Sequence, residues 1–281
     1  MQRSLGRPSL RPRLAALAIG AVIGAGAAAL AASDVSASGQ VLVAKGAAVH
    51  VAAVLPMTGG NADLGSGALN AVRLAIALHP RIKGFPIQLQ VLDGPCGPDG
   101  GQNVAAANQI VADPRNVAVI GHFCSNHMIE VLPIYESAGV VTVSGSTTNP
   151  ALPSYGPNVF NSVAVPDGCC PYVDNFDPWY ATVAVLPVDQ IWRQIYLFVY
   201  RSPAPDFADL YFDATRLLIA KVSAAATLDE NGNLIVDRTS LAQKMRSTSN
   251  FPAVTCAVSL GLDGFRINDS ESLARCASTG G

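Results

Sequence analysis

The sequence predicts an α/β fold with a parallel sheet flanked by helices, and three observations support this prediction. Short apolar runs alternate with amphipathic stretches from about residue 48 onward. Hydrophobic residues make up 50% of the chain and charged residues only 14%, so the chain supplies a buried core and disorder is disfavoured. The ends of the apolar runs carry small and hydroxylated residues instead of further core residues. A folded α/β domain with polar strand ends is therefore expected.

The individual elements follow from the spacing of the apolar residues. Four runs are expected to form buried strands: His50–Leu55, Ile87–Asp93, Val117–Ile120 and Val140–Val143. Apolar residues recur at helical spacing between the first three runs, at Leu69, Val72, Ala75 and Ile76 and then at Val104, Ala107 and Val111. Ser125 is expected to cap a third helix that buries Met128, Ile129 and Leu132. Four strands alternating with three helices predict a Rossmann-like parallel sheet with right-handed crossovers.

The N-terminal segment has the pattern of an export signal. Four arginines precede an uncharged apolar stretch over residues 14–32, and small residues follow at 35–37. Cleavage near Ala37 would make residues 1–37 a signal peptide, and the protein would be exported. An uncleaved membrane anchor is the alternative, but the alanine and glycine content makes the stretch weakly hydrophobic.

Export allows the cysteines to form disulfides, because the compartment is oxidising. Cys96 and Cys124 each follow a predicted strand at the same edge of the sheet and are the expected pair. Cys256 and Cys276 are candidates for a second pair near the C-terminus. The adjacent Cys169 and Cys170 stay open between free thiols, intermolecular bonds and exchange with the other four.

Several other functions find little support in the sequence. A formal net charge of −2 gives no basic field for phosphate contacts, so no nucleic-acid partner is expected. His122, Cys124 and His127 form an H-x-C-x-x-H pattern, but no fourth ligand is evident and no metal is expected. Nucleotide-loop, serine-elbow and zinc-protease motifs are absent, and an exported hydrolase using Cys169 or Cys170 has no motif in its favour. The expected protein is not an enzyme and needs no cofactor.

The strand ends carry the most specific signal. The first predicted strand runs into residues 56–65, the third into 121–125 and the fourth into 144–150. The passage from His50 to Asp167 resembles the periplasmic leucine/isoleucine/valine-binding proteins, the type I solute-binding proteins of branched-chain amino acid ABC importers. The resemblance includes these loops, the Cys96 and Cys124 pair, and segments 134–140 and 155–160.

The resemblance implies a ligand site at these loops. Ser125 and the N–H groups that open its helix would hold a carboxylate, which the helix dipole also favours. The Ser146 carbonyl and the Thr148 hydroxyl would face an ammonium group, with Thr147 between them. Leu64 would form a wall of the side-chain pocket. The alternative is that Ser125 is only a helix cap and that the threonine pair is only a turn.

The second half of the chain departs from the family. Residues 48–167 correspond to the first ligand-binding lobe, but 168–200 are too few for a second sheet and are expected to form a shortened linker. Trp179, Tyr180, Trp192 and Tyr196 in this region are interpreted as core residues. The resemblance returns at 207–218, 234–241 and 251–255, so residues 201–270 are expected to return and pack on the first lobe. The predicted fold is thus a type I periplasmic binding protein lobe with the second lobe shortened or absent.

Together these features predict an extracytoplasmic solute-binding protein at the periplasmic or outer face of the cytoplasmic membrane. It would capture branched-chain amino acids or similar small amides for the membrane permease of an ABC importer. The alternative is a single-lobe ligand-sensing or partner-docking module without transport activity. The sequence leaves the bound solute open.

Overall fold

The computed structural model of the chain describes residues 39–166 and 187–267. Several predicted features lie outside these ranges: the signal peptide at 1–37, Cys169, Cys170, Cys276, Trp179 and Tyr180. The predictions made for them stay predictions.

The main sheet has five strands in the order β3-β4-β2-β5-β6. Four of them are parallel: β2 (Val49–Leu55), β4 (Phe85–Asp93), β5 (Asn116–Gly121) and β6 (Val141–Val143). The short β3 (Arg81–Ile82) joins the edge of β4 in antiparallel orientation. The predicted parallel sheet and its four strands are confirmed, with small shifts in their bounds.

The strand order determines where a ligand can bind. The chain passes from β2 to β4 on one side and then places β5 and β6 on the other side of β2. The crossover loops after β2 and β5 therefore diverge from each other at the carboxyl edge of the sheet. Such a topological switch point is the usual position of a ligand crevice in α/β proteins.

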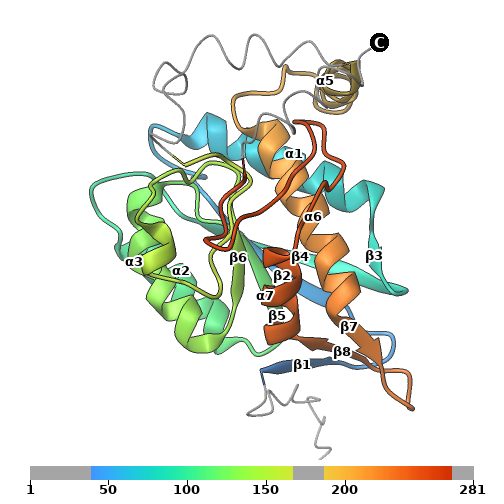
Figure 1. Cartoon of the computed structure of the whole chain (residues 1–281). Helices are drawn as coiled ribbons and strands as arrows, with labels where there is room; N and C mark the ends of the chain where they lie inside the picture. The colour runs from blue at the N-terminus through green and yellow to red at the C-terminus, as the bar shows by residue number, and fades with distance from the viewer. Residues whose placement is uncertain (1–38, 167–186, 268–281) are drawn as a thin grey trace, which may run out of the picture. The chain divides into compact units, whose positions relative to one another are not determined.

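Helices cover both faces of this sheet (Figure 1). α2 (Gly101–Ala112) and α3 (Ser125–Ala138) lie on one face, and α1 (Ala62–Leu78) and α6 (Ala208–Ala225) lie on the other. Alternate residues of β2 serve the two cores: Val51, Ala53 and Leu55 pack on the α1 and α6 side, and Ala52 and Val54 on the α2 and α3 side. This period of two is the pattern expected of a strand that is buried on both faces.

One local prediction is wrong. Ser125 does not cap α3: Cys124 occupies the N-cap position, and Ser125 is the first helical residue. The Ser125 hydroxyl oxygen instead accepts hydrogen bonds from the backbone N–H groups of Thr148 and Asn149. A contact with a neighbouring loop has thus replaced the local cap.

The later part of the chain adds helices and a second sheet. A short 3₁₀-helix, η1 (Leu152–Ser154), follows β6, and α5 (Pro187–Tyr200) occupies the second part of the range predicted as a linker. α5 buries Trp192 and Tyr196, which are 3% and 1% exposed, as predicted for core residues. β1 (Gln40–Val43), β8 (Leu234–Asp237) and β7 (Ala226–Leu228) form an antiparallel three-stranded sheet, and α7 (Arg238–Arg246) follows β8.

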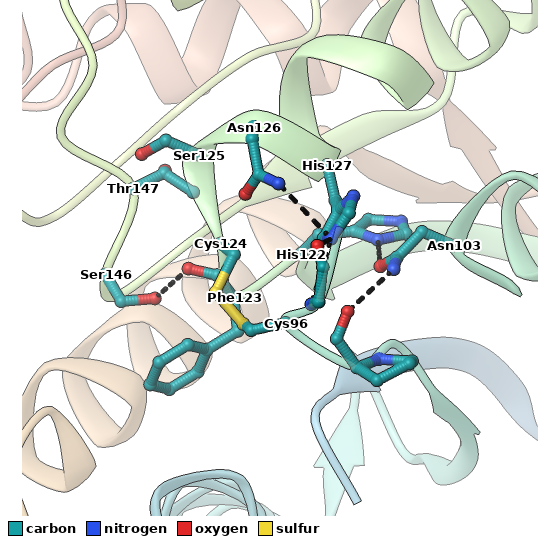
Figure 2. The surroundings of a disulfide bond; sticks show 12 residues. Cys96, Asn103, His122, Phe123, Cys124, Ser125, Asn126, His127, Ser146 and Thr147 are labelled. Carbon is teal, nitrogen blue, oxygen red and sulfur yellow. Dashed lines mark hydrogen bonds between the residues drawn. A yellow bond between two sulfur atoms is a disulfide. The ribbon is translucent and has the colours of Figure 1, made fainter. Parts of the chain in front are cut away.

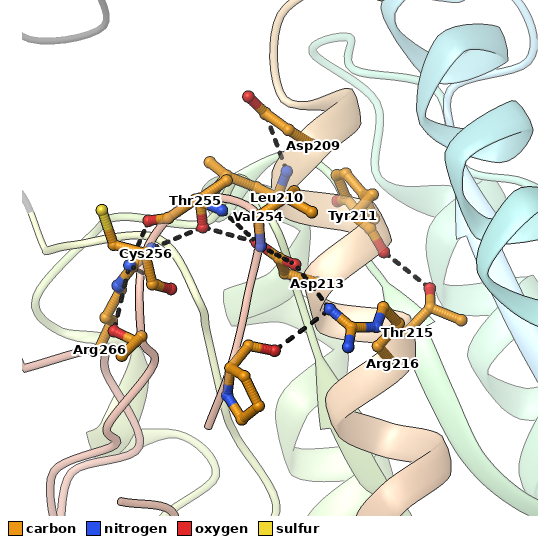
Figure 3. Close-up of polar contacts among 12 residues, drawn as sticks. Asp209, Leu210, Tyr211, Asp213, Thr215, Arg216, Val254, Thr255, Cys256 and Arg266 are labelled. Atoms are coloured by element: carbon orange, nitrogen blue, oxygen red, sulfur yellow. Dashed lines mark hydrogen bonds and ion pairs between the residues drawn. The ribbon is translucent and has the colours of Figure 1, made fainter. Parts of the chain in front are cut away.

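Polar contacts join these late elements to the rest of the fold. The Arg238 guanidinium donates to the carbonyls of Asn116, 2.6 Å away, and Ala138, 3.3 Å away, at the amino end of the main sheet. Asp213 of α6 accepts hydrogen bonds from the N–H groups of Val254 and Thr255, both at 2.9 Å (Figure 3).

Among residues 39–166 and 187–267, no helix is both long and apolar enough to span a bilayer.

Candidate functional site

The loop after β2 is held at the carboxyl edge of the sheet by Asp93, the last residue of β4. The Asp93 carboxylate accepts hydrogen bonds from the Met57 N–H at 2.8 Å and from the Thr58 hydroxyl at 2.6 Å. Gly65 lets this loop lie directly on α1, because a Cβ there would be 1.9 Å from the Pro56 carbonyl oxygen. Leu64, in the first turn of the same helix, is partly buried against the core. The sequence prediction missed Asp93, although an acidic residue at a strand end was a usable signal.

A disulfide joins the loop after β4 to the start of α3. Cys96 and Cys124 form this bond, with their Cα atoms 5.8 Å apart, as the sequence predicts (Figure 2). Because Cys124 is the N-cap residue directly before Ser125, the disulfide holds the loop after β4 next to the start of α3. The pairing predicted for Cys256 and Cys276 stays a prediction.

A chain of buried hydrogen bonds stabilises the loop after β4 and the start of the loop after β5. Asn103 donates its amide to the Pro95 carbonyl and its oxygen lies 2.7 Å from Nδ1 of His122. The other ring nitrogen, Nε2, lies 2.9 Å from the Tyr135 hydroxyl. Burial lowers the pKa of His122 to about 3, so the imidazole is neutral at physiological pH. In that form Nδ1–H donates to Asn103 and Nε2 accepts from Tyr135.

The side chains of the H-x-C-x-x-H pattern are already used in other bonds. Both nitrogens of His122 have partners, Cys124 is oxidised, and His127 Nε2 lies 2.9 Å from the Gly97 carbonyl. Within the described ranges, no cluster of three or more His, Cys, Asp or Glu side chains is arranged to hold a metal ion.

Ser125 and Thr148 are brought into direct contact. The Ser125 hydroxyl oxygen accepts from the Thr148 N–H at 3.1 Å and from the Asn149 N–H at 3.4 Å. A hydroxyl also carries one proton to donate, and no acceptor for that proton is found among the described residues. The N-terminus of α3 receives no hydrogen bond from a capping side chain. A donor hydroxyl therefore lies beside an uncapped helix N-terminus.

Ser146 and Thr147 lie on the same loop as Thr148 but in different environments. The Ser146 hydroxyl donates to the Phe123 carbonyl at 2.6 Å, so its side chain supports the loop after β5 (Figure 2). The Thr147 carbonyl accepts from Ser162 at 2.9 Å. The hydroxyl of Thr147 is buried and has no hydrogen-bond partner among the described residues. A buried hydroxyl without a partner is costly unless a water or a ligand satisfies it.

The sequence prediction also missed Tyr211 of α6. The Tyr211 hydroxyl lies 2.9 Å from the Ser146 hydroxyl and 3.3 Å from that of Ser144. No local motif marks this residue, because its partners lie more than sixty positions earlier in the chain. Only the packing of α6 reveals the contact.

The fold is an α/β lobe, and these loops lie at its topological switch point, which is the usual position of a ligand crevice in such folds. The profile of the periplasmic binding protein family matches residues 48–174. Over these residues the chain matches that family, and the resemblance predicted from the sequence is confirmed.

Relatives of known name support this assignment. An amino acid binding protein of Pseudomonas aeruginosa is 36% identical over 105 residues, which are 36% of this chain and 27% of that protein. The leucine-specific-binding protein of Salmonella typhimurium is 37% identical over 111 residues, 38% of this chain and 29% of that protein. The matched segment thus spans less than a third of the length of these relatives.

A solved structure shows the same fold over a larger part of the chain. The crystal structure of a putative branched-chain amino acid ABC transporter from Rhodospirillum rubrum matches with a TM-score of 0.64 at 17% identity. The alignment covers 79% of this chain and 96% of that one.

Proposed function

We propose that the chain is an extracytoplasmic solute-binding protein that captures a branched-chain amino acid or a similar small amide for the permease of an ABC importer. The observation that carries the proposal is the start of α3, where the Ser125 hydroxyl has a proton to donate beside a helix N-terminus without a side-chain cap. Helix N-termini favour anions, and the carboxylate of an amino acid is such a group. The names of the relatives support the same class of solute.

The proposed partners of the ligand's ammonium group lie on the loop after β6. In this proposal, the Ser146 carbonyl and the Thr148 hydroxyl accept from the ammonium. Thr147, whose hydroxyl has no partner in the part of the chain that the structure describes, lies between them in the sequence. Leu64 contributes an apolar wall, which favours an apolar substrate side chain. An ammonium and a carboxylate must both regain in the site the hydrogen bonds they lose in water.

We further propose a domain organisation and a location for the protein. Residues 1–37 direct export to the periplasm or the outer face of the cytoplasmic membrane, 48–167 form the ligand-binding lobe, 168–200 connect, and 201–270 pack back on that lobe. The protein acts by binding, not by catalysis, and without a cofactor. Because closure of a second lobe excludes water and strengthens polar contacts, a lobe without that cover is expected to bind its ligand weakly.

The test is isothermal titration of the purified chain with leucine, isoleucine, valine and a panel of small amides. Wild-type protein should bind at least one of them saturably, and the double variant Ser125→Ala, Thr148→Ala should lose most of the affinity. Hydrogen bonds to charged groups contribute about 1.5 to 3 kcal/mol each, so the loss of two should weaken binding by at least about 100-fold.

The matched control removes two hydroxyls of the same kinds away from the site. Ser137 lies at the other end of α3, where its hydroxyl bonds the Ile134 carbonyl, and Thr227 is exposed on β7. The variant Ser137→Ala, Thr227→Ala should bind like wild type. A folded wild-type protein that binds none of the ligands would contradict the proposal.

A second candidate function, a partner-docking module, is favoured by the outer face of α5. Ile191 and Phe198 on this helix are 60% and 70% exposed, opposite the buried Trp192 and Tyr196. Exposed apolar patches often mark interaction surfaces. If a second copy of the chain covers this face, sedimentation velocity will show a mass that rises with concentration, and the variant Ile191→Glu, Phe198→Glu will stay monomeric. A wild-type mass that is monomeric at all concentrations would exclude this self-association.

A further inference from the structure

Tyr211 contacts both loops that carry the proposed ligand groups. Its side chain is 0% exposed on α6, and its hydroxyl lies 2.9 Å from Ser146 Oγ. Its ring stacks on Phe123, with ring centroids 5.6 Å apart and an angle of 6° between the planes. Phe123 lies two residues before Ser125, so a single side chain packs beside the start of α3 and against the loop after β6.

The direction of the hydrogen bonds follows from counting protons. Ser144 donates its hydroxyl proton to the His122 carbonyl at 2.9 Å, and Ser146 donates its proton to the Phe123 carbonyl at 2.6 Å. Each serine hydroxyl has only one proton, so Tyr211 must be the donor to Ser146. Burial raises the pKa of Tyr211 to about 12, and the phenol therefore keeps its proton at physiological pH. The chain of donors runs from Tyr211 through Ser146 to Phe123.

The backbone of the loop lies against α6 at the same point. A Cβ on Gly145 would be 2.9 Å from the Tyr211 backbone nitrogen and 3.0 Å from the Leu210 carbonyl carbon. Backbone atoms at this distance cannot move aside cheaply, so glycine is required for the close approach. The position of residues 144–146 is therefore set by contact with the first turn of α6.

We propose that Tyr211 is a positioning residue for the ligand site: it sets the separation between the start of α3 and the loop of residues 146–148. This proposal rests on the proposed function of that site. The two parts meet where Ser125 Oγ accepts from the Thr148 N–H at 3.1 Å. Without the Tyr211 hydroxyl, Ser146 loses its donor, and the loop after β6 loses a hydrogen bond that joins it to α6. The Ser146 carbonyl then moves relative to Ser125.

The test compares Tyr211→Phe with a matched variant, Tyr200→Phe, in the full chain. Both variants remove one phenol hydroxyl, but the Tyr200 hydroxyl donates to the Asn70 carbonyl on α1, outside the site loops. Titration with leucine should show about a tenfold loss of affinity for Tyr211→Phe, the size of one lost hydrogen bond, and little change for Tyr200→Phe. Ser146→Ala removes the acceptor, and adding Tyr211→Phe to it should cause little further loss.

A measurement on the ligand-free chain tests the role of Tyr211 independently of the proposed function. In ¹H–¹⁵N spectra of the ligand-free chain, the amide signals of Ser146, Thr147 and Thr148 should shift in Tyr211→Phe and stay in place in Tyr200→Phe. If wild type fails to bind leucine, the proposed function fails for that ligand, and the spectra still decide the role of Tyr211. If Tyr211→Phe does not fold, Ser146→Ala should shift the amides of Thr147 and Thr148. Unshifted amides in the folded variants, or wild-type affinity of Tyr211→Phe for leucine, would overturn the proposal.

Discussion

At the scale of single residues, His122 stabilises the loops of the candidate site, although its side chain is not among the proposed ligand contacts. Its imidazole is fully buried between Asn103 and Tyr135, at 2.7 and 2.9 Å. Through Asn103 it also reaches the Pro95 carbonyl, beside the disulfide at Cys96. The neutral ring satisfies both neighbours, and a proton on Nε2 would remove the acceptor for the Tyr135 hydroxyl. Protonation of His122 should therefore act against the folded state.

The resulting prediction concerns stability against pH. Burial lowers the His122 pKa to about 3 in the folded protein, well below its ordinary value of 6.5, so the unfolded chain takes up this proton first. The contribution of His122 to the free energy of unfolding is complete above pH 6.5 and is lost as the pH falls toward 3. Between pH 7 and pH 5 the free energy of unfolding should fall by about 2 kcal/mol at this one residue. Urea unfolding at both pH values measures it.

The control for this prediction is His122→Gln, which has a side-chain amide but no titrating group. Asp213 is also buried, and desolvation raises its pKa, so its contribution is lost as the pH rises through its folded value. That contribution is common to both proteins and cancels in their difference. The variant should thus be less stable than wild type at pH 7 but should lose less stability on acidification. Equal pH dependence in the two proteins would show that His122 is not the group responsible.

Residues that act through near neighbours or strand ends were predictable from the sequence, and residues that act through packing were not. Cys96 and Cys124 could be paired because both follow parallel strands, whose carboxyl ends meet at one edge. Ser125 was expected to cap its own helix, but its hydroxyl oxygen contacts the loop after β6. Tyr211 has no local signal, because its position depends on how α6 packs. The ligand roles of Ser125, Ser146, Thr147, Thr148 and Leu64 stay proposals.

At the scale of elements, length and burial decided what the sequence could reveal. The strands of the main sheet are buried on both faces and appear as apolar runs, and α1, α2 and α3 fill the intervals between them. The small sheet was not predicted, since β1 and β8 have four residues each and pair across almost two hundred residues of chain. α5 follows a proline-rich interval, which the sequence interpretation took for a linker. Short elements with distant partners give no usable periodicity.

Within α6, some contacts could be predicted from the sequence and others could not. The spacing of Leu210, Ala214, Leu217 and Leu218 in the sequence indicates a shared apolar face, and all four are buried. The helix also buries polar side chains. One carboxylate oxygen of Asp213 accepts from the Val254 N–H, and the other accepts from both the Thr255 N–H and the Thr255 hydroxyl, the latter at 2.7 Å (Figure 3). These partners come from a segment about forty residues later. An amphipathic pattern predicts the first contact surface of such a helix and not the second.

At the scale of the whole molecule, the late segment completes the core that the first half begins. α6 packs along α1, and Leu217 and Val222 within it are completely buried. Arg238 donates to carbonyls at the start of β5 and the end of α3. Without residues 187–267, the α1 face of the sheet would expose a large apolar surface, which is costly at about 25 cal/mol per Å². The first half of the chain should therefore depend on the second half for its fold.

This dependence gives the last prediction, which compares two truncated chains. A chain that ends at residue 166 keeps every strand of the main sheet but lacks α5, α6 and α7. It should show no cooperative thermal transition by circular dichroism and should bind a hydrophobic dye, because the surface that α6 covers is exposed. A chain that ends at residue 267 keeps all of these elements and should unfold in a single transition, as is expected of the full chain. If the shorter chain unfolds cooperatively and binds leucine as tightly as the longer one, the late segment is dispensable for the lobe, and Tyr211 cannot be what positions its site.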